Sequence, residues 1–247
     1  MQINVISTAD NTAAADLTGQ VVVVFDVLRA CSTIVTALAN GCKRVIPVVS
    51  VEEARSVNKP GVILGGERNA VKIPGFTCGN SPLEYSPETV SNRTVVLTTT
   101  NGTRAINGAL AARAKELYVG CILNAGAVGR LLWNKHNDVC LVCAGTKGQF
   151  SLEDTFAAGL VIREILFLAG SPGAVNQPDS SVKLTDLAVT AYYLASTNYE
   201  RPLQLLQESL HGQRLINMGL EEDLKWCARE NYFDFVPALK NGTIVLE

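Results

Sequence analysis

Apolar residues along this chain gather in short, uninterrupted runs. Four of these runs are rich in β-branched residues and stop abruptly at polar or glycine residues: 21–25, 62–64, 95–97 and 139–143. Continuous apolar runs of this length are typical of strands buried on both faces of a sheet. The pattern therefore predicts four central strands.

Helical patterns follow most of these strands and give a repeated order of strand, loop and helix. The predicted helices cover Ser32–Asn40, Thr103–Arg113 and Ser151–Ala169, and glycine closes the first and the last. Short second strands are expected at 44–49 and 116–119. The first and third of these units look alike, which leaves open a chain built from two similar halves.

The last part of the chain has a different pattern. A loop rich in Pro, Gly, Asn and Ser is expected at 172–181, followed by helices at 184–196, 202–210 and 220–229 and a strand at 243–246. The whole pattern predicts an α/β fold. We expect three α/β/α layers, a mostly parallel or mixed sheet, and a helical C-terminal part. Residues 1–247 are expected to form a single α/β domain, with sub-lobes 1–120 and 121–247 left open.

Composition narrows the class of protein. With 47% apolar and 18% charged residues, the chain has the make-up of a compact globular protein. Its net charge is −2 and it has no concentrated basic run, so neither a nucleic acid nor a membrane is an expected partner. The seven cysteines are scattered through apolar stretches, as expected for reduced thiols. We expect a cytoplasmic protein and leave a homo-oligomer open.

Polar residues gather where the predicted strands end. In open α/β sheets the ligand crevice lies outside the carboxyl ends of the strands. After the first strand come Asp26 and Arg29, with Ser32 and Thr33 at a helix start that favours an anion. Helix capping and an Asp26–Arg29 ion pair would also explain this segment.

The other strand ends carry similar chemistry. Their candidate groups are Glu67 and Arg68 after the second strand, Thr98, Thr99, Thr100, Asn101, Gly102 and Thr103 after the third, and Thr146, Lys147, Ser151, Glu153 and Asp154 after the fourth. A capping box would also explain Ser151 and Asp154. Four strand ends with acids, cations and hydroxyls nevertheless favour one shared ligand, an oxyanion with a divalent metal.

The expected metal follows from the type of donor. Asp26, Glu67, Glu153 and Asp154 are hard oxygen ligands, which together with a phosphate indicate Mg²⁺. His211 lies beside Gly212 and near Arg214, where it could bind an anion. The chain has none of the usual glycine-rich nucleotide signatures.

Six segments in order resemble a known family. They are VVVVFDVLRACSTIVTALANG (21–41), GGER (65–68), GFTCGNSPLEY (75–85), TTTNGTRA (98–105), CAGTKGQFSLEDTFAAG (143–159) and SLHGQRLINMGLEEDLKWCA (209–228). Together they are similar to the 2-phosphosulfolactate phosphatases over nearly the whole chain. The resemblance implies a Mg²⁺-dependent enzyme that hydrolyses 2-phospho-3-sulfolactate to sulfolactate and phosphate, a step of coenzyme M biosynthesis. It also implies an α/β fold distinct from the common phosphatase folds.

Specific roles follow for the candidate residues. We expect Asp26, Arg29 and Arg68 to be catalytic, with the two arginines neutralising charge on the phosphoryl oxygens. The hydroxyl groups, Lys147 and His211 would bind the remaining anionic groups of a small substrate. Two alternatives stay open: a phosphatase for another 2-phospho carboxylic acid, and a non-catalytic module that binds sulfonate or phosphate.

Overall fold

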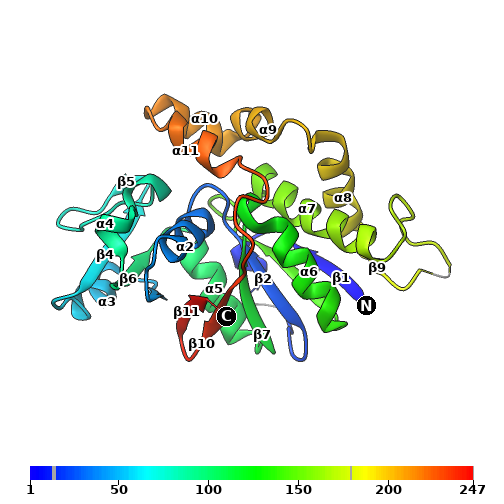
Figure 1. Ribbon diagram of the computed structural model, residues 1–247, viewed down its shortest axis with the longest axis horizontal. Helices are drawn as coiled ribbons and strands as arrows, with labels where there is room; N and C mark the ends of the chain where they lie inside the picture. The colour runs from blue at the N-terminus through cyan, green and yellow to red at the C-terminus, as the bar shows by residue number, and fades with distance from the viewer. Residues whose placement is uncertain (13–14, 179, 247) are drawn as a thin grey trace.

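The protein is built around one mixed sheet of eleven strands. A computed structural model describes residues 1–12, 15–178 and 180–246. The strand order is β5-β4-β6-β3-β11-β10-β7-β2-β8-β1-β9 (Figure 1). The strands are β1 (Gln2–Ile6), β2 (Val21–Phe25), β3 (Arg44–Pro47), β4 (Val62–Arg68), β5 (Val71–Lys72), β6 (Thr94–Thr98), β7 (Glu116–Gly120), β8 (Val139–Cys143), β9 (Lys183–Leu184), β10 (Pro237–Lys240) and β11 (Thr243–Leu246).

Two parallel sets of strands make up most of this sheet. Strands β4, β6 and β3 form one set, and β7, β2, β8, β1 and β9 form the other. The antiparallel β10–β11 hairpin joins them, with Ala238 paired to Tyr118 on one side and Ile244 to Val45 on the other. Because each of these junctions is antiparallel, the two sets run in opposite directions within the sheet.

Helices cover both faces of the sheet, which confirms the predicted α/β fold. Helices α6, α7 and α8 pack together on one face, and α1 and α5 pack together on the other. The helices are α1 (Ala9–Thr12), α2 (Ala30–Ala39), α3 (Val51–Ser56), α4 (Pro87–Val90), α5 (Gly102–Ala111), α6 (Ala125–Lys135), α7 (Leu152–Leu168), α8 (Asp186–Asn198), α9 (Pro202–Glu208), α10 (Leu210–Asn217) and α11 (Glu221–Cys227). Two short 3₁₀ helices, η1 (Pro82–Glu84) and η2 (Ile122–Asn124), complete the elements.

Burial explains why the apolar runs become strands. All five residues of β2 are fully buried, and the strand pairs with β7 on one side and β8 on the other. The structure adds to the predicted elements the strands β1, β5, β9 and β10 and the helices α1, α3, α4, α6 and α10. β1 is only five residues long, and α6 contains two glycines that weaken its helical signal.

The helical C-terminal part is confirmed and lies over one end of the sheet. Helices α9, α10 and α11 form a cap above the strand ends (Figure 1). Turns fill most of the predicted 172–181 loop, of which position 179 lies outside the described residues. The set of β7, β2, β8, β1 and β9 contains strands from both sides of residue 120, whereas β3, β4 and β6 all precede it. No helix among the described residues combines the length and apolarity needed to cross a membrane.

Candidate active site

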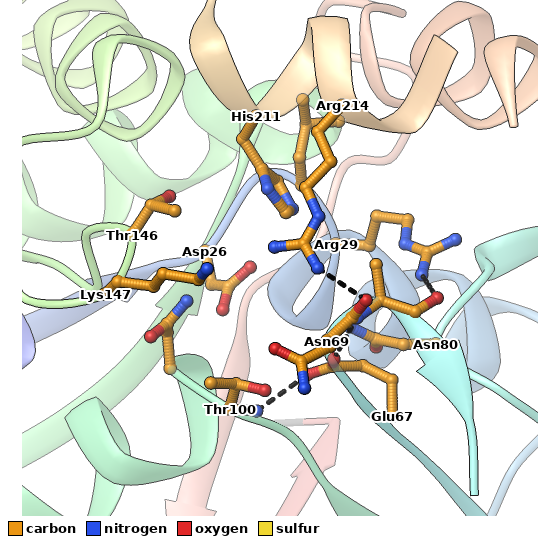
Figure 2. A pocket seen from close by; sticks show the side chains of 13 residues that line it. Asp26, Arg29, Glu67, Asn69, Asn80, Thr100, Thr146, Lys147, His211 and Arg214 are labelled. Atoms are coloured by element: carbon orange, nitrogen blue, oxygen red, sulfur yellow. Dashed lines mark hydrogen bonds between the residues drawn. The ribbon is translucent and has the colours of Figure 1, made fainter. Parts of the chain in front are cut away.

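Strand ends from both parallel sets line a single cavity. Asp26 follows β2, Glu67 is the last but one residue of β4, Thr100 follows β6, and Lys147 follows β8. The space between the atoms of the cavity is about 420 Å³, a volume that includes solvent at its open mouth. The lining residues are Asp26, Leu28, Arg29, Glu67, Asn69, Ala70, Asn80, Thr100, Asn101, Thr146, Lys147, His211 and Arg214 (Figure 2). The structure thus brings the four predicted strand ends together.

Asp26 is the acid at the floor of this cavity. Its side chain is 7% exposed, and its Oδ1 accepts a hydrogen bond from the backbone N–H of Ala30 at 3.0 Å. Burial raises the pKa of Asp26 to about 7, and the charges of Glu67 and Glu153 contribute in the same direction. A Cβ at Gly102 would lie 2.7 Å from Asp26 Oδ2 and 2.6 Å from the Ala30 side chain, so only glycine fits there. The start of α5 therefore packs directly against the carboxylate.

Glu67 is fixed by two backbone groups. Its Oε2 accepts from the N–H of Ala70 and its Oε1 from the N–H of Thr100, both at 2.7 Å. These bonds tie the turn after β4 to the loop after β6. The carboxylate is 6% exposed and lines the cavity, so it faces a ligand from a rigid position.

Arg29 lies at the start of α2 and is almost completely buried. Its Nη1 forms an ion pair with Asp223 Oδ2 at 2.6 Å, and its Nη2 donates to the carbonyl of Ala70 at 3.2 Å. The predicted Asp26–Arg29 ion pair is therefore absent from the ion pairs among the described residues, and Asp223 of α11 takes that place. A guanidinium has five N–H donors, so these two bonds leave Arg29 able to hold an anion.

Helix α10 forms the roof of the cavity. His211 and Arg214 are three residues apart and lie on one face of α10, and Figure 2 shows both reaching down toward the acids. Arg214 Nη2 donates to the carbonyl of Asn69 at 2.7 Å. Burial lowers the pKa of His211 to about 4, with Arg29 and Arg214 adding repulsion, so His211 is neutral at pH 7.

Unpaired polar atoms concentrate at this cavity. Within the described part of the chain, four buried side-chain polar atoms lack a hydrogen-bond partner. Three of them belong to cavity-lining residues: Asn80 Oδ1, Thr100 Oγ1 and His211 Nδ1. Because leaving a buried polar group unpaired costs roughly 1–3 kcal/mol, such atoms indicate a place where a ligand supplies the partner.

Several predicted hydroxyl groups serve the backbone instead of the cavity. Thr99 and Thr103 exchange hydrogen bonds at the start of α5, each hydroxyl accepting from the other's N–H. Ser32 donates to the carbonyl of Val27, and Thr33 donates to the carbonyl of Asn80. These four side chains support the loops that line the cavity without lining it themselves.

Arg68 and Thr98 also lie outside the cavity lining. Arg68 Nη2 donates to the carbonyl of Val49 and to Thr98 Oγ1, both at 3.0 Å. Thr98 Oγ1 in turn donates to the same carbonyl at 3.1 Å. The guanidinium is therefore turned toward the loop after β3, and a catalytic role for Arg68 stays a prediction without support from its position.

The three residues predicted near the start of α7 take different positions. Ser151 caps the helix by accepting from the N–H of Asp154. Asp154 accepts from the N–H groups of Val27 and Gly145, at 2.8 and 3.1 Å, beneath the cavity floor. Glu153, 3% exposed, lines a neighbouring cavity that shares Thr146 and His211 with the first. Burial raises the pKa of both acids.

The donor set can be compared with the needs of a metal ion. Among the residues that the structure describes, no three His, Cys, Asp or Glu side chains are grouped so as to hold a metal, so the four predicted acids do not form one ligand shell. Mg²⁺ is commonly bound by one or two carboxylates together with water and substrate phosphate. Asp26 and Glu67, with the unpaired oxygens of Asn80 and Thr100, fit that requirement.

Sequence reasoning missed Asn69, Asn80, Arg214 and Asp223 as site residues. The sequence pattern named Arg214 only as a neighbour of His211 and predicted no helix over 210–217; in α10 the three-residue spacing places both side chains on one face. Asn69 and Ala70 have φ values of 58° and 67° and form a left-handed turn. The sequence does not indicate this turn, because neither position is a glycine. Asn80 and Asp223 are brought in by tertiary packing alone.

An α/β fold whose strand ends gather carboxylates, guanidinium groups and unpaired polar atoms defines an enzyme site for a small anion. Comparison with known proteins specifies the class. A family model described as 2-phosphosulpholactate phosphatase matches residues 6–242. The chain belongs to this family, and the membership confirms the predicted enzyme class, a phosphoric monoester hydrolase.

Individual relatives agree with the family model. A probable 2-phosphosulfolactate phosphatase of Clostridium tetani is 42% identical over 247 residues, covering 99% of this chain and 100% of its own. One from Symbiobacterium thermophilum is 45% identical over 237 residues, with 94% and 97% coverage. One from Clostridium perfringens is 43% identical over 250 residues, with 99% and 96% coverage. The similarity therefore extends over the whole site, including α10 and α11.

Proposed function

We propose that the protein hydrolyses 2-phospho-3-sulfolactate to 3-sulfolactate and phosphate, using Mg²⁺. The observation that carries the proposal is the cavity itself, where Asp26 and Glu67 face three cationic side chains, Arg29, Lys147 and Arg214. A substrate with phosphate, carboxylate and sulfonate groups requires several cations. The acids would repel it unless a cation lies between, which favours a metal-dependent reaction over simple anion binding.

The chain's own groups divide the work of binding. Arg29 and Arg214 donate to the oxyanions, and both are already oriented by backbone carbonyls of the turn after β4, those of Ala70 and Asn69. Lys147 is exposed at the mouth, where it attracts and screens the incoming anion. His211 is neutral and adds no charge, and because its ring N–H is directed at the carbonyl of Leu28, its unpaired Nδ1 can accept a hydrogen bond from water or from a protonated group of the ligand. These contacts fix the phosphoryl group against the floor of the cavity.

Asp26, with Glu67, would hold Mg²⁺ on the floor. When bound, this ion would supply charge stabilisation at the phosphoryl oxygens. If Asp26 held the ion, or attacked the phosphorus itself, its loss would abolish turnover in either case. We also propose that the protein is cytoplasmic, with its cysteines reduced. We further propose that it acts in coenzyme M biosynthesis.

Phosphate release tests the proposal. The purified protein is assayed with 2-phospho-3-sulfolactate, phospholactate, phosphoglycolate and p-nitrophenyl phosphate, each with Mg²⁺ and with excess EDTA. We expect release to be fastest from 2-phospho-3-sulfolactate and to stop in EDTA. Faster release from another ester would replace the substrate, release unaffected by EDTA would contradict the metal, and binding without any release would indicate a binding module.

A further inference from the structure

A buried network connects the catalytic floor to the C-terminal cap. Asp223 in the first turn of α11 is 2% exposed and accepts from Arg29 Nη1 at 2.6 Å with its Oδ2. Its Oδ1 accepts from Ser81 Oγ, also at 2.6 Å. Both carboxylate oxygens are therefore engaged, one by a cavity-lining cation and one by the loop before η1.

The network is more specific than helix packing requires. Helix α11 is already anchored on α2, because Trp226 Nε1 donates to Thr36 Oγ1 at 2.9 Å and Leu224 and Cys227 are fully buried. Removing two charges from water is expensive, and apolar side chains of similar size usually stabilise a core as well as a buried ion pair does. The pair between Arg29 and Asp223 thus calls for a reason other than stability.

The geometry of Arg29 supplies that reason. Arginine has four rotatable side-chain bonds, and an anion-binding guanidinium is effective only when its planar fork is held in one orientation. Asp223 holds Nη1 and the carbonyl of Ala70 holds Nη2, so both terminal nitrogens of the fork are fixed in place. Ser81 prevents the carboxylate from rotating.

We propose that Asp223 is a positioning residue for the reaction, which acts through Arg29 by holding its guanidinium in the orientation that contacts the substrate anion. Ser81 supports it in that role. The inference rests on the proposed function, since it assigns Arg29 to the substrate. It also makes α11 a working part of the site, although Asp223 itself does not line the cavity.

A double-mutant cycle tests the inference. Asp223→Ala is made in the wild-type protein and in Arg29→Lys, and kcat/KM for phosphate release and the affinity for inorganic phosphate are measured. In the wild-type protein we expect Asp223→Ala to lower kcat/KM by about 10- to 100-fold. In Arg29→Lys it should lower kcat/KM by less than about threefold further, because the fork that Asp223 orients is already gone. Phosphate affinity should follow the same pattern.

Structural damage would give a different result. If Asp223→Ala merely loosened α11, it would also displace His211 and Arg214, and its effect would be equally large in Arg29→Lys. Equal losses in both backgrounds, or wild-type values in Asp223→Ala, would overturn the inference. Should Asp223→Ala not fold, Asp223→Asn and Ser81→Ala pass through the same cycle, with smaller losses that must also disappear in Arg29→Lys.

Glu222→Ala is the matched control. Glu222 is the neighbour of Asp223 on α11, exposed, and paired with Lys225 at 2.7 Å outside the cavity, so its kcat/KM and phosphate affinity should stay at wild-type values. The two proposals fail separately. An inactive wild-type protein would contradict the proposed substrate, while the phosphate titrations of the four proteins would still decide whether Asp223 acts through Arg29.

Discussion

Replacing Asp26 by asparagine should abolish activity and, in the absence of metal, make the protein more stable. Asp26 is 7% exposed and faces Glu67 and Glu153, so its charge is held in a place that disfavours it. Its pKa is raised from 3.8 to about 7. At roughly 1.4 kcal/mol per pKa unit, the ionised carboxylate costs the folded state about 4 kcal/mol at pH 8.

The substitution recovers only part of that energy. Asparagine keeps an oxygen for the N–H of Ala30, but its amide nitrogen would face the N–H of Gly102, which now bonds to the carboxylate. Losing that bond costs about 1–2 kcal/mol. The expected net gain at pH 8 is therefore about 2 kcal/mol, or roughly 4–8 °C in Tm for a chain of this size.

The pH dependence gives the prediction its sign. A carboxyl group whose folded pKa is raised makes its full contribution to stability below its unfolded pKa of 3.8 and loses it as pH rises through about 7. The wild-type protein should lose stability over this range, and Asp26→Asn should lose less. The gain should therefore be close to zero at pH 5 and fully developed at pH 8.

Thermal unfolding in EDTA at pH 5 and pH 8 provides the measurement. Asp186→Asn, at an exposed acid in the first turn of α8, is the control and should change Tm equally at both pH values. Added Mg²⁺ should raise the Tm of the wild-type protein and leave that of Asp26→Asn unchanged. A variant that is no more stable than wild type at pH 8, or equally more stable at both pH values, would refute the reasoning.

Three further predictions concern single features. Gly102→Ala should lower kcat at least about tenfold and the free energy of unfolding by about 2 kcal/mol, because the added Cβ meets Asp26 and Ala30. The phosphate-release assay and a urea titration measure the two effects. An unchanged kcat would contradict the packing. Lys147→Ala should raise KM about tenfold with little change in Tm, since this side chain is exposed at the cavity mouth; a fall in kcat alone would argue against an attracting role. All seven cysteines are buried, and burial raises the pKa of Cys121 to about 12. A thiol reagent should therefore react slowly with the native protein and fully after denaturation. Rapid reaction in the native state would refute their burial.

Much of the sheet could be predicted because its strands are buried on both faces. The runs 21–25 and 139–143 coincide with β2 and β8, and no alternative periodicity competes with five consecutive apolar residues. The direction of the two parallel sets could not be predicted. It depends on single pairings of the β10–β11 hairpin with β7 and β3, and such long-range register leaves no local pattern.

The candidate site could be predicted where chemistry follows a strand directly. Asp26 and Glu67 come at strand ends and do line the cavity. Arg68 shows the limit of this reasoning, because its guanidinium bonds to the backbone carbonyls of Glu67 and Val49 instead of entering the cavity beside the Glu67 carboxylate. Asp223 shows another limit, since nothing in its own helix reveals that it pairs with Arg29 nearly two hundred residues earlier.

The β10–β11 hairpin has a consequence for how the protein is made. Strands β10 and β11, at 237–246, come later in the sequence than every cavity-lining residue, and they join the two parallel sets. A growing chain on the ribosome already contains every residue that lines the cavity, but not the strands that hold its two sides in one sheet. Each side can collapse early as its own βα unit. The two sides of the cavity therefore belong to one sheet only once residues 237–246 have paired with both β7 and β3, so a chain cut before residue 237 would carry the site residues without the strands that hold them together.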